Sequence, residues 1–149
     1  MITIISGTNK ADSLTRVISS IYYNRLRSLD SRTRFLSLED INYNFITGTM
    51  YHKHESGIER LQEQIFNPSK KFVFVVPEYN GSIPGVLKLL IDALDVRPAF
   101  SGKKAALTGI ATGRAGNLRG LDHMSSILQR MHVTGMPHML PISRGKDEL

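Results

Sequence analysis

The chain has 149 residues, of which 41% are hydrophobic and 21% charged, a composition typical of one soluble globular domain, 1–149. It contains no cysteine, which excludes disulfides, thiolate catalysis and cysteine-ligated metal centres. The formal net charge is +6, yet the basic residues are scattered rather than grouped, so a nucleic-acid partner is not expected.

Three features of the sequence bear on where the protein is located in the cell: its apolar runs, its N-terminal residues and its last four residues. No apolar run approaches the roughly 18 residues of a membrane span, and the N-terminal sequence MITIISGTNK lacks the basic start of a signal peptide. The last four residues, KDEL, match an endoplasmic-reticulum retention signal. That signal acts only on chains that enter the secretory pathway, so we interpret the match as coincidence or truncation. The sequence predicts a cytoplasmic protein with no membrane partner.

The first half of the chain alternates apolar strands with amphipathic helical spacing. A strand is predicted at 2–6, followed by a helix from 13 to about 29, where apolar residues recur every three or four positions. A second strand covers 33–38. Residues 40–56 show no period and are expected to form a long irregular excursion, after which a helix at 58–65 is ended by an Asn-Pro pair.

The second half repeats this alternation, beginning with a strand that is apolar on both faces, as a central parallel strand requires. The expected elements are, in order, a strand at 71–76, a helix at 84–95 with Pro84 in its first turn, a strand at 104–111, a helix over 118–131, and a last strand near 133–140 that ends at Pro141.

Strands that alternate with helices predict an α/β fold, in which a parallel sheet has helices on both faces. Five strands in a chain of 149 residues fit a flavodoxin-like doubly wound sheet with strand order 2-1-3-4-5. In such sheets ligands bind beyond the carboxyl ends of the strands, where the order reverses. The loops after the first, third and fourth strands are therefore expected to form the site.

These three loops have unusual compositions. The first, SGTNKADS at 6–13, offers hydroxyl, amide and lysine groups at a helix start, which suits a phosphate, with a plain capped turn as the alternative. The second, PEYNG at 77–81, and the third, ATGRAGN at 111–117, carry glycines that let a flat ligand approach the backbone. A core-packed turn and a flexible connection are their respective alternatives. Together the loops suit FMN, which combines a phosphate with a planar heterocycle.

The sequence also resembles the NADPH-dependent FMN reductases, a flavodoxin-like family that includes quinone, azo-dye and chromate reductases. The resemblance is carried by PEYNGSIPGVLKLLIDAL at 77–94, by the SGTNKADS loop and by TGRAGNLRG at 112–120. It implies bound FMN, with no side chain required as general acid or base. The positions that it assigns to the phosphate are Thr8, Lys10, Ser13, Leu14 and Thr15, and those beside the isoalloxazine are Pro77, Glu78, Tyr79, Asn80, Gly81, Thr112, Gly113, Arg114 and Gly116.

The implied activity passes hydride from NADPH, or NADH, to FMN and on to a small-molecule acceptor such as a quinone, a free flavin or an azo compound. The alternative is a flavodoxin-like FMN electron carrier without its own NADPH oxidation. Such carriers present an acidic face, whereas this chain is basic, and NADPH carries an additional phosphate, so charge favours the enzyme. A phosphoryl-accepting signalling domain is excluded, because the strand ends read IISG and VVPE without the acidic residues it needs.

Two further features of the sequence bear on metal binding and on acid–base catalysis. His52, His54 and Glu55 are close in sequence, but no third histidine has metal-site spacing, so no metal is expected. Glu78 is interpreted as structural rather than catalytic. The resemblance implies a homodimer or homotetramer with flavin sites near subunit interfaces, and the apolar residues of 40–56 are hypothesised to cover a partner's site.

Overall fold

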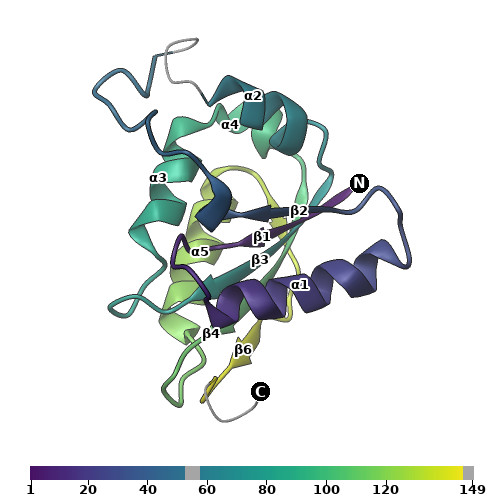
Figure 1. Cartoon of the computed structure of the whole chain (residues 1–149), viewed down its shortest axis with the longest axis vertical. Helices are drawn as coiled ribbons and strands as arrows, with labels where there is room; N and C mark the ends of the chain where they lie inside the picture. The colour runs from purple at the N-terminus through teal and green to yellow at the C-terminus, as the bar shows by residue number, and fades with distance from the viewer. Residues whose placement is uncertain (53–57, 146–149) are drawn as a thin grey trace.

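The computed structural model describes residues 1–52 and 58–145, and its centre is a parallel β-sheet (Figure 1). Each pair of neighbouring strands is parallel, so the predicted α/β fold with strand order 2-1-3-4-5 is confirmed. The strands, in the order in which they lie side by side, are β2 (Arg34–Ser37), β1 (Ile2–Ser6), β3 (Lys71–Pro77), β4 (Lys104–Ile110) and β5 (Thr134–Gly135).

The last strand differs from the prediction. Instead of one strand near 133–140, the chain forms β5 and, after a break, β6 (Leu140–Ile142), and both pieces pair with β4. Pro137 lies in the break, where its missing N–H removes no ladder hydrogen bond. Pro141 lies inside β6 rather than after it, which is tolerated because β6 has only one neighbouring strand.

Helix α1 (Leu14–Arg27) covers one face of the sheet (Figure 1). Ser13 is its N-cap, because the Ser13 hydroxyl accepts a hydrogen bond from the Arg16 N–H at 3.2 Å. Among the described residues, α1 is the only helix on this face. Its apolar side packs on a core cluster that contains Ile4, Val73, Val75 and Ile110.

The opposite face of the sheet carries the remaining helices, which enclose the larger core. Phe66, Phe72 and Phe100 meet there with ring centroids 5.5 to 5.9 Å apart. No helix in the described parts of the chain is long and apolar enough to cross a bilayer. The elements on this face are α2 (Glu59–Leu61), the π-helical turn η2 (Gln62–Phe66), α3 (Gly85–Ala93), α4 (Val96–Ala99) and α5 (Leu118–Arg130).

The helix predicted over 84–95 is shorter than expected. Pro84 has an extended ψ of 134° and precedes α3 as its N-cap instead of lying in its first turn. At the other end, Asp95 caps α4 by accepting from the Arg97 N–H at 3.3 Å, so the chain leaves one helix and immediately starts another.

The predicted excursion at 40–56 follows a short 3-10 helix, η1 (Leu38–Asp40), and is described as far as residue 52. Phe45 and Met50 are 7% and 4% exposed and pack inside this chain, whereas Tyr51 is 67% exposed. Two of the apolar side chains expected to cover a partner are therefore part of the protein's own interior. The homodimer or homotetramer stays a prediction.

Lys103 is a buried cation outside the predicted site. Its ammonium donates to the carbonyl oxygens of Phe66 at 2.6 Å and Asn67 at 3.1 Å, where η2 ends, and lies 5.7 Å from the centroid of the Phe72 ring. Burial, together with the charge of Lys70, lowers the pKa of Lys103 to about 8. The neutral amine still has two N–H donors, so both carbonyl groups remain satisfied after deprotonation.

The Lys103 pKa predicts how stability depends on pH. Because the folded-state value lies below the unfolded value of 10.5, the unfolded chain binds more protons between about pH 8 and 10.5, and stability due to this group rises with pH across that window. Urea unfolding measures the free energy of unfolding at pH 7.5 and at pH 9.5. Between these two pH values it should rise by about 1–2 kcal/mol more in wild type than in Lys103→Met. Parallel changes in the two proteins would contradict this assignment.

Candidate functional site

A cavity of about 550 Å³ lies beyond the carboxyl ends of β1, β3 and β4, within the range of roughly 300–1,000 Å³ seen for cofactor sites. The predicted residues that line it are Thr8, Lys10, Ser13, Leu14, Thr15, Pro77, Glu78, Tyr79, Thr112, Gly113 and Arg114. Further residues also line it, and these are Asp12, Ala111 and Ala115 in the predicted loops, Ile110 at the end of β4, and Gly145.

The first loop brings backbone donors to the cavity. Among the described residues, the N–H groups of Leu14 and Thr15 have no hydrogen-bond acceptor, because they belong to the first turn of α1. The adjoining Ser13 and Thr15 side chains are buried, and Lys10 is exposed beside them. Free N–H groups at the positive end of a helix dipole, next to hydroxyls and an ammonium, form a site suited to an anion.

The second loop is a tight turn. Tyr79 and Ser82 exchange backbone hydrogen bonds of 2.9 and 3.1 Å around Asn80 and Gly81, which have φ values of 52° and 76°. Positive φ at both central positions is the requirement that makes Asn-Gly a preferred pair in such turns. Asn80 and Gly81 thus shape the loop and do not line the cavity, unlike Pro77, Glu78 and Tyr79.

A side-chain hydrogen bond joins the first two loops. The hydroxyl oxygens of Thr8 and Tyr79 are 2.7 Å apart, although 71 positions separate the residues in sequence. Thr8 is 1% exposed and also accepts from the Lys10 N–H at 3.2 Å, while Tyr79 is 37% exposed. The tyrosine ring therefore has a fixed position at the cavity edge with one part open to solvent.

The third loop presents bare backbone. A Cβ added to Gly113 would meet no atom within 4 Å, so this wall of the cavity is open. Gly116 is different: it has φ +57°, and a Cβ there would come within 2.6 Å of the Pro141 Cβ. Gly116 is therefore required for packing against β6 and does not line the cavity.

Asn117 anchors the third loop. It is fully buried with φ +65°, its amide donates to the Val76 carbonyl at 2.9 Å, and its oxygen accepts from the Gly120 N–H at 3.1 Å. Asn117 is thus the N-cap of α5, and the same side chain also attaches α5 to the end of β3.

The segment after β6 supports the third loop from outside. The Arg144 N–H donates to the Gly113 carbonyl at 3.0 Å, and the Gly145 N–H donates to Ala111 at 3.1 Å. A Cβ on Gly145 would come within 2.6 Å of Leu14 Cδ2, so the segment also touches α1. Asp12, Ala111 and Ala115 lie within the predicted loops and Ile110 lies at the end of β4, but nothing local in the sequence points to Gly145.

Glu78 and the segment that contains His52, His54 and Glu55 were considered in the sequence as a catalytic group and as metal ligands. Glu78 is exposed at the cavity, and its N–H donates to the Ile110 carbonyl at 2.8 Å, which gives its backbone a structural role. His54 and Glu55 lie outside the described residues. Within residues 1–52 and 58–145, no three acidic, histidine or cysteine side chains are grouped as metal ligands would be.

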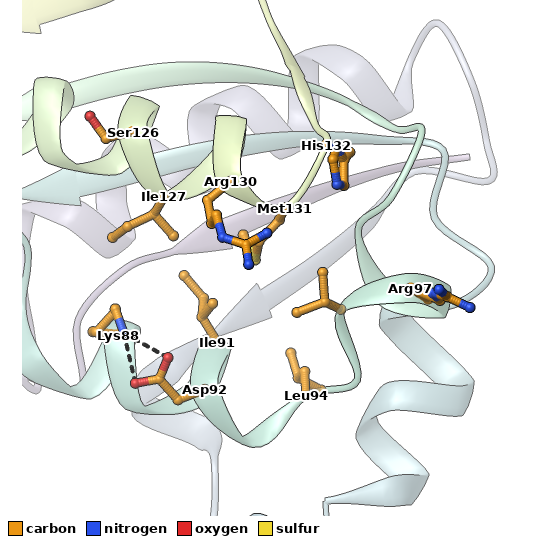
Figure 2. A pocket seen from close by; sticks show the side chains of 11 residues that line it. Lys88, Ile91, Asp92, Leu94, Arg97, Ser126, Ile127, Arg130, Met131 and His132 are labelled. Atoms are coloured by element: carbon orange, nitrogen blue, oxygen red, sulfur yellow. Dashed lines mark hydrogen bonds and ion pairs between the residues drawn. The ribbon is translucent and has the colours of Figure 1, made fainter.

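A second cleft, of about 670 Å³, lies between α3 and α5 (Figure 2). Its walls include Ile91, Ile127 and Met131, and Lys88 Nζ lies 2.6 and 2.8 Å from the two carboxylate oxygens of Asp92 at its side. It reaches His132, whose carbonyl accepts from the loop leading into β4, so it lies toward the amino ends of the strands. It contains no predicted site residue.

A parallel sheet of order 2-1-3-4-5 with its cavity at the carboxyl ends of the central strands defines the flavodoxin-like class of α/β proteins. The sequence pattern of the NADPH-dependent FMN reductase family matches residues 1–147. The chain belongs to this family, as its resemblance predicted.

Similarity to individual proteins agrees with membership of this family. Over 78 residues the chain is 42% identical to an NAD(P)H-dependent FMN reductase of Pseudomonas aeruginosa, covering 51% of this chain and 42% of that protein. Over 85 residues it is 36% identical to a quinone reductase of Pseudomonas putida, and the match covers 54% of this chain and 43% of that protein. These matches thus span less than half of each relative. An oxidoreductase structure from Corynebacterium diphtheriae shares the fold, with a TM-score of 0.78 at 19% identity over 98% of this chain and 82% of that one.

Asn117 provides a test of the site's framework. Asn117→Ala removes both buried hydrogen bonds and leaves the Val76 carbonyl and Gly120 N–H unpaired, which should lower the free energy of unfolding by about 2–4 kcal/mol. Asn117→Asp keeps the acceptor for Gly120 but sets a buried carboxylate oxygen against the Val76 carbonyl oxygen, so its loss should be at least as large. Urea denaturation measures both. Equal stability of Asn117→Ala and wild type would show that the bridge to β3 is not needed.

Proposed function

We propose that this protein is an NAD(P)H-dependent FMN reductase, which takes hydride from NADPH or NADH and delivers electrons to a small-molecule acceptor such as a quinone, a free flavin or an azo compound. One observation carries the proposal: a single cavity has unpaired backbone N–H groups at a helix start on one side and bare glycine backbone on the other. Family membership agrees with it.

The lining residues fit FMN in chemistry and size. The phosphate would be held by the N–H groups of Leu14 and Thr15 and by hydroxyl groups nearby, with Lys10 adding positive charge. The isoalloxazine would lie between the second and third loops, where Gly113 leaves space and Tyr79 offers an aromatic ring. When bound, FMN supplies the redox chemistry, accepting hydride and passing on electrons.

The protein's contribution is to bind, orient and stabilise. Backbone N–H groups of the third loop are suited to stabilise negative charge on the ring's polar edge, as preorganised donors do in other sites. The Thr8–Tyr79 hydrogen bond fixes the ring-side loop relative to the phosphate-side loop. The exposed Arg114 at the cavity provides a cation for the phosphates of a dinucleotide donor. No side chain is required to transfer a proton.

The phosphate assignment predicts the effect of a charge at Ser13. Ser13→Asp keeps a good helix cap but sets a carboxylate against the phosphate, so it should weaken FMN binding by about tenfold or more. Titration with FMN, followed by flavin fluorescence, measures the affinity.

Two controls distinguish the effect of the added negative charge at position 13 from the effect of the larger side chain. Ser13→Asn has nearly the same size as Ser13→Asp and caps equally well without charge, so its FMN affinity should stay much closer to wild type. Riboflavin lacks the phosphate, so Ser13→Asp and Ser13→Asn should bind it alike. Undiminished FMN binding by Ser13→Asp would show that the phosphate lies elsewhere.

Reduction of the bound flavin by NADPH or NADH distinguishes the enzyme from the alternative, a flavodoxin-like carrier. Protein reconstituted with FMN should consume NADPH continuously when a quinone, free flavin or azo compound is present, and flavin absorbance should bleach under anaerobic NADPH alone. Absorbance at the NADPH and flavin bands follows both steps. A holoprotein that dithionite reduces but NADPH and NADH do not would support the carrier instead.

A further inference from the structure

The turn at residues 79–82 carries the aromatic ring of the candidate site, yet few atoms pack against it. Tyr79 and Asn80 are exposed, Gly81 and Ser82 are half-buried, and only Tyr79 of the four lines the cavity. A Cβ at Gly81 would meet no atom of the described residues within 4 Å. A segment with few buried contacts is held mainly by its hydrogen bonds. The position of the Tyr79 ring therefore depends on where this turn is attached.

One attachment of the turn is on the α1 side of the cavity. The Tyr79 hydroxyl lies 2.7 Å from the Thr8 hydroxyl oxygen in the first loop. The backbone hydrogen bonds between Tyr79 and Ser82, which are 2.9 and 3.1 Å long, close the turn into one unit. Because the turn is closed in this way, an attachment at Ser82 also restrains Tyr79.

The other attachment of the turn is a histidine on α5. The Ser82 hydroxyl oxygen lies 2.8 Å from Nδ1 of His123, which is 41 positions further along the chain, in the second turn of α5. The hydroxyl donates to an unprotonated Nδ1 and accepts from a protonated one, so either tautomer of the imidazole forms this bond. Through the buried Asn117, α5 is itself bonded to the Val76 carbonyl of β3 at 2.9 Å. His123 thus connects the turn to a helix that is fixed to the sheet.

A serine hydroxyl bonded to an imidazole is also the arrangement of a nucleophile with its general base. A hydrolytic role requires an orienting group on the other ring nitrogen and a substrate cavity beside the serine. Among the described residues no carboxylate is bonded to His123, and Ser82 is not one of the residues that line the cavity of about 550 Å³. The pair therefore fits an attachment of the turn better than a nucleophile.

We propose that His123 is a positioning residue for the flavin ring, which acts through Ser82 to hold the 79–82 turn and the Tyr79 side chain at the wall of the cavity. This role presupposes the FMN binding proposed above. His123 does not itself line the cavity, so it orders the turn and does not contact the flavin. Without the hydrogen bond between Ser82 and His123, the turn is ordered only when the ring binds, and the entropy lost at that step lowers the affinity.

Flavin affinity, measured by fluorescence titration, tests this role. His123→Ala should weaken the binding of FMN by about three- to tenfold and that of riboflavin by the same factor, because the ring rather than the phosphate loses its support. His123→Asn places an amide where Nδ1 lies and should recover most of the affinity. His138→Ala, which removes an exposed histidine between β5 and β6, should bind both flavins as wild type does. Circular dichroism verifies that each variant is folded.

A second variant tests whether Ser82 transmits the effect. Ser82→Ala should weaken the binding of both flavins by a factor similar to that of His123→Ala. The double variant should bind no more weakly than either single variant, because all three lose the same hydrogen bond. Losses that multiply in the double variant would overturn the proposal, since they would show that the two residues act independently.

Three other results would also overturn it. These are equal flavin affinities of His123→Ala and wild type, a larger loss for FMN than for riboflavin, which would place the effect at the phosphate, and a loss that His123→Asn shares in full. Wild type that binds neither flavin would reject the proposed function itself. Wild type that binds FMN with the same affinity as His123→Ala would reject only the role of His123.

Discussion

The parallel register of β1, β3 and β4 is the constraint on which the site depends. Ser6 pairs with Val75, and Val75 pairs with Thr108, so the three strands end at one edge and release their loops side by side. The hydrogen bonds continue one step beyond: the Gly7 N–H donates to Val75 at 2.9 Å, and the Glu78 N–H donates to Ile110 at 2.8 Å. Loops far apart in sequence are thereby brought around one cavity.

Glycines without a Cβ let these loops and strand ends pack closely against neighbouring backbone and side chains. A Cβ on Gly7 would come within 2.9 Å of the Val75 carbonyl oxygen, and one on Gly109 would collide with the Gly116 carbonyl oxygen and Leu121. Such glycines are required for packing, whereas Gly113 faces open space and is free to meet a ligand. The same residue type thus has two physical roles within one site.

Local signals predicted most of the fold and the main loops. The apolar spacing of α1 and its Ser13 cap, and the doubly apolar run of β3, depend on nearby residues and were found from sequence. The division of the last strand was missed because pairing with β4 decides it. Asn80 and Gly81 form a turn through their positive φ values, and their contact with a ligand stays a prediction. Gly145 reaches the cavity only through tertiary hydrogen bonds.

We propose that backbone N–H groups at the start of α1 hold the phosphate of a flavin whose ring rests on the second and third loops. A crystal structure of the protein with FMN tests it most directly. We expect phosphate oxygens about 3 Å from the Leu14 and Thr15 nitrogen atoms and the ring beside Tyr79 and Gly113. FMN bound instead in the cleft between α3 and α5, or with its phosphate away from α1, would contradict it.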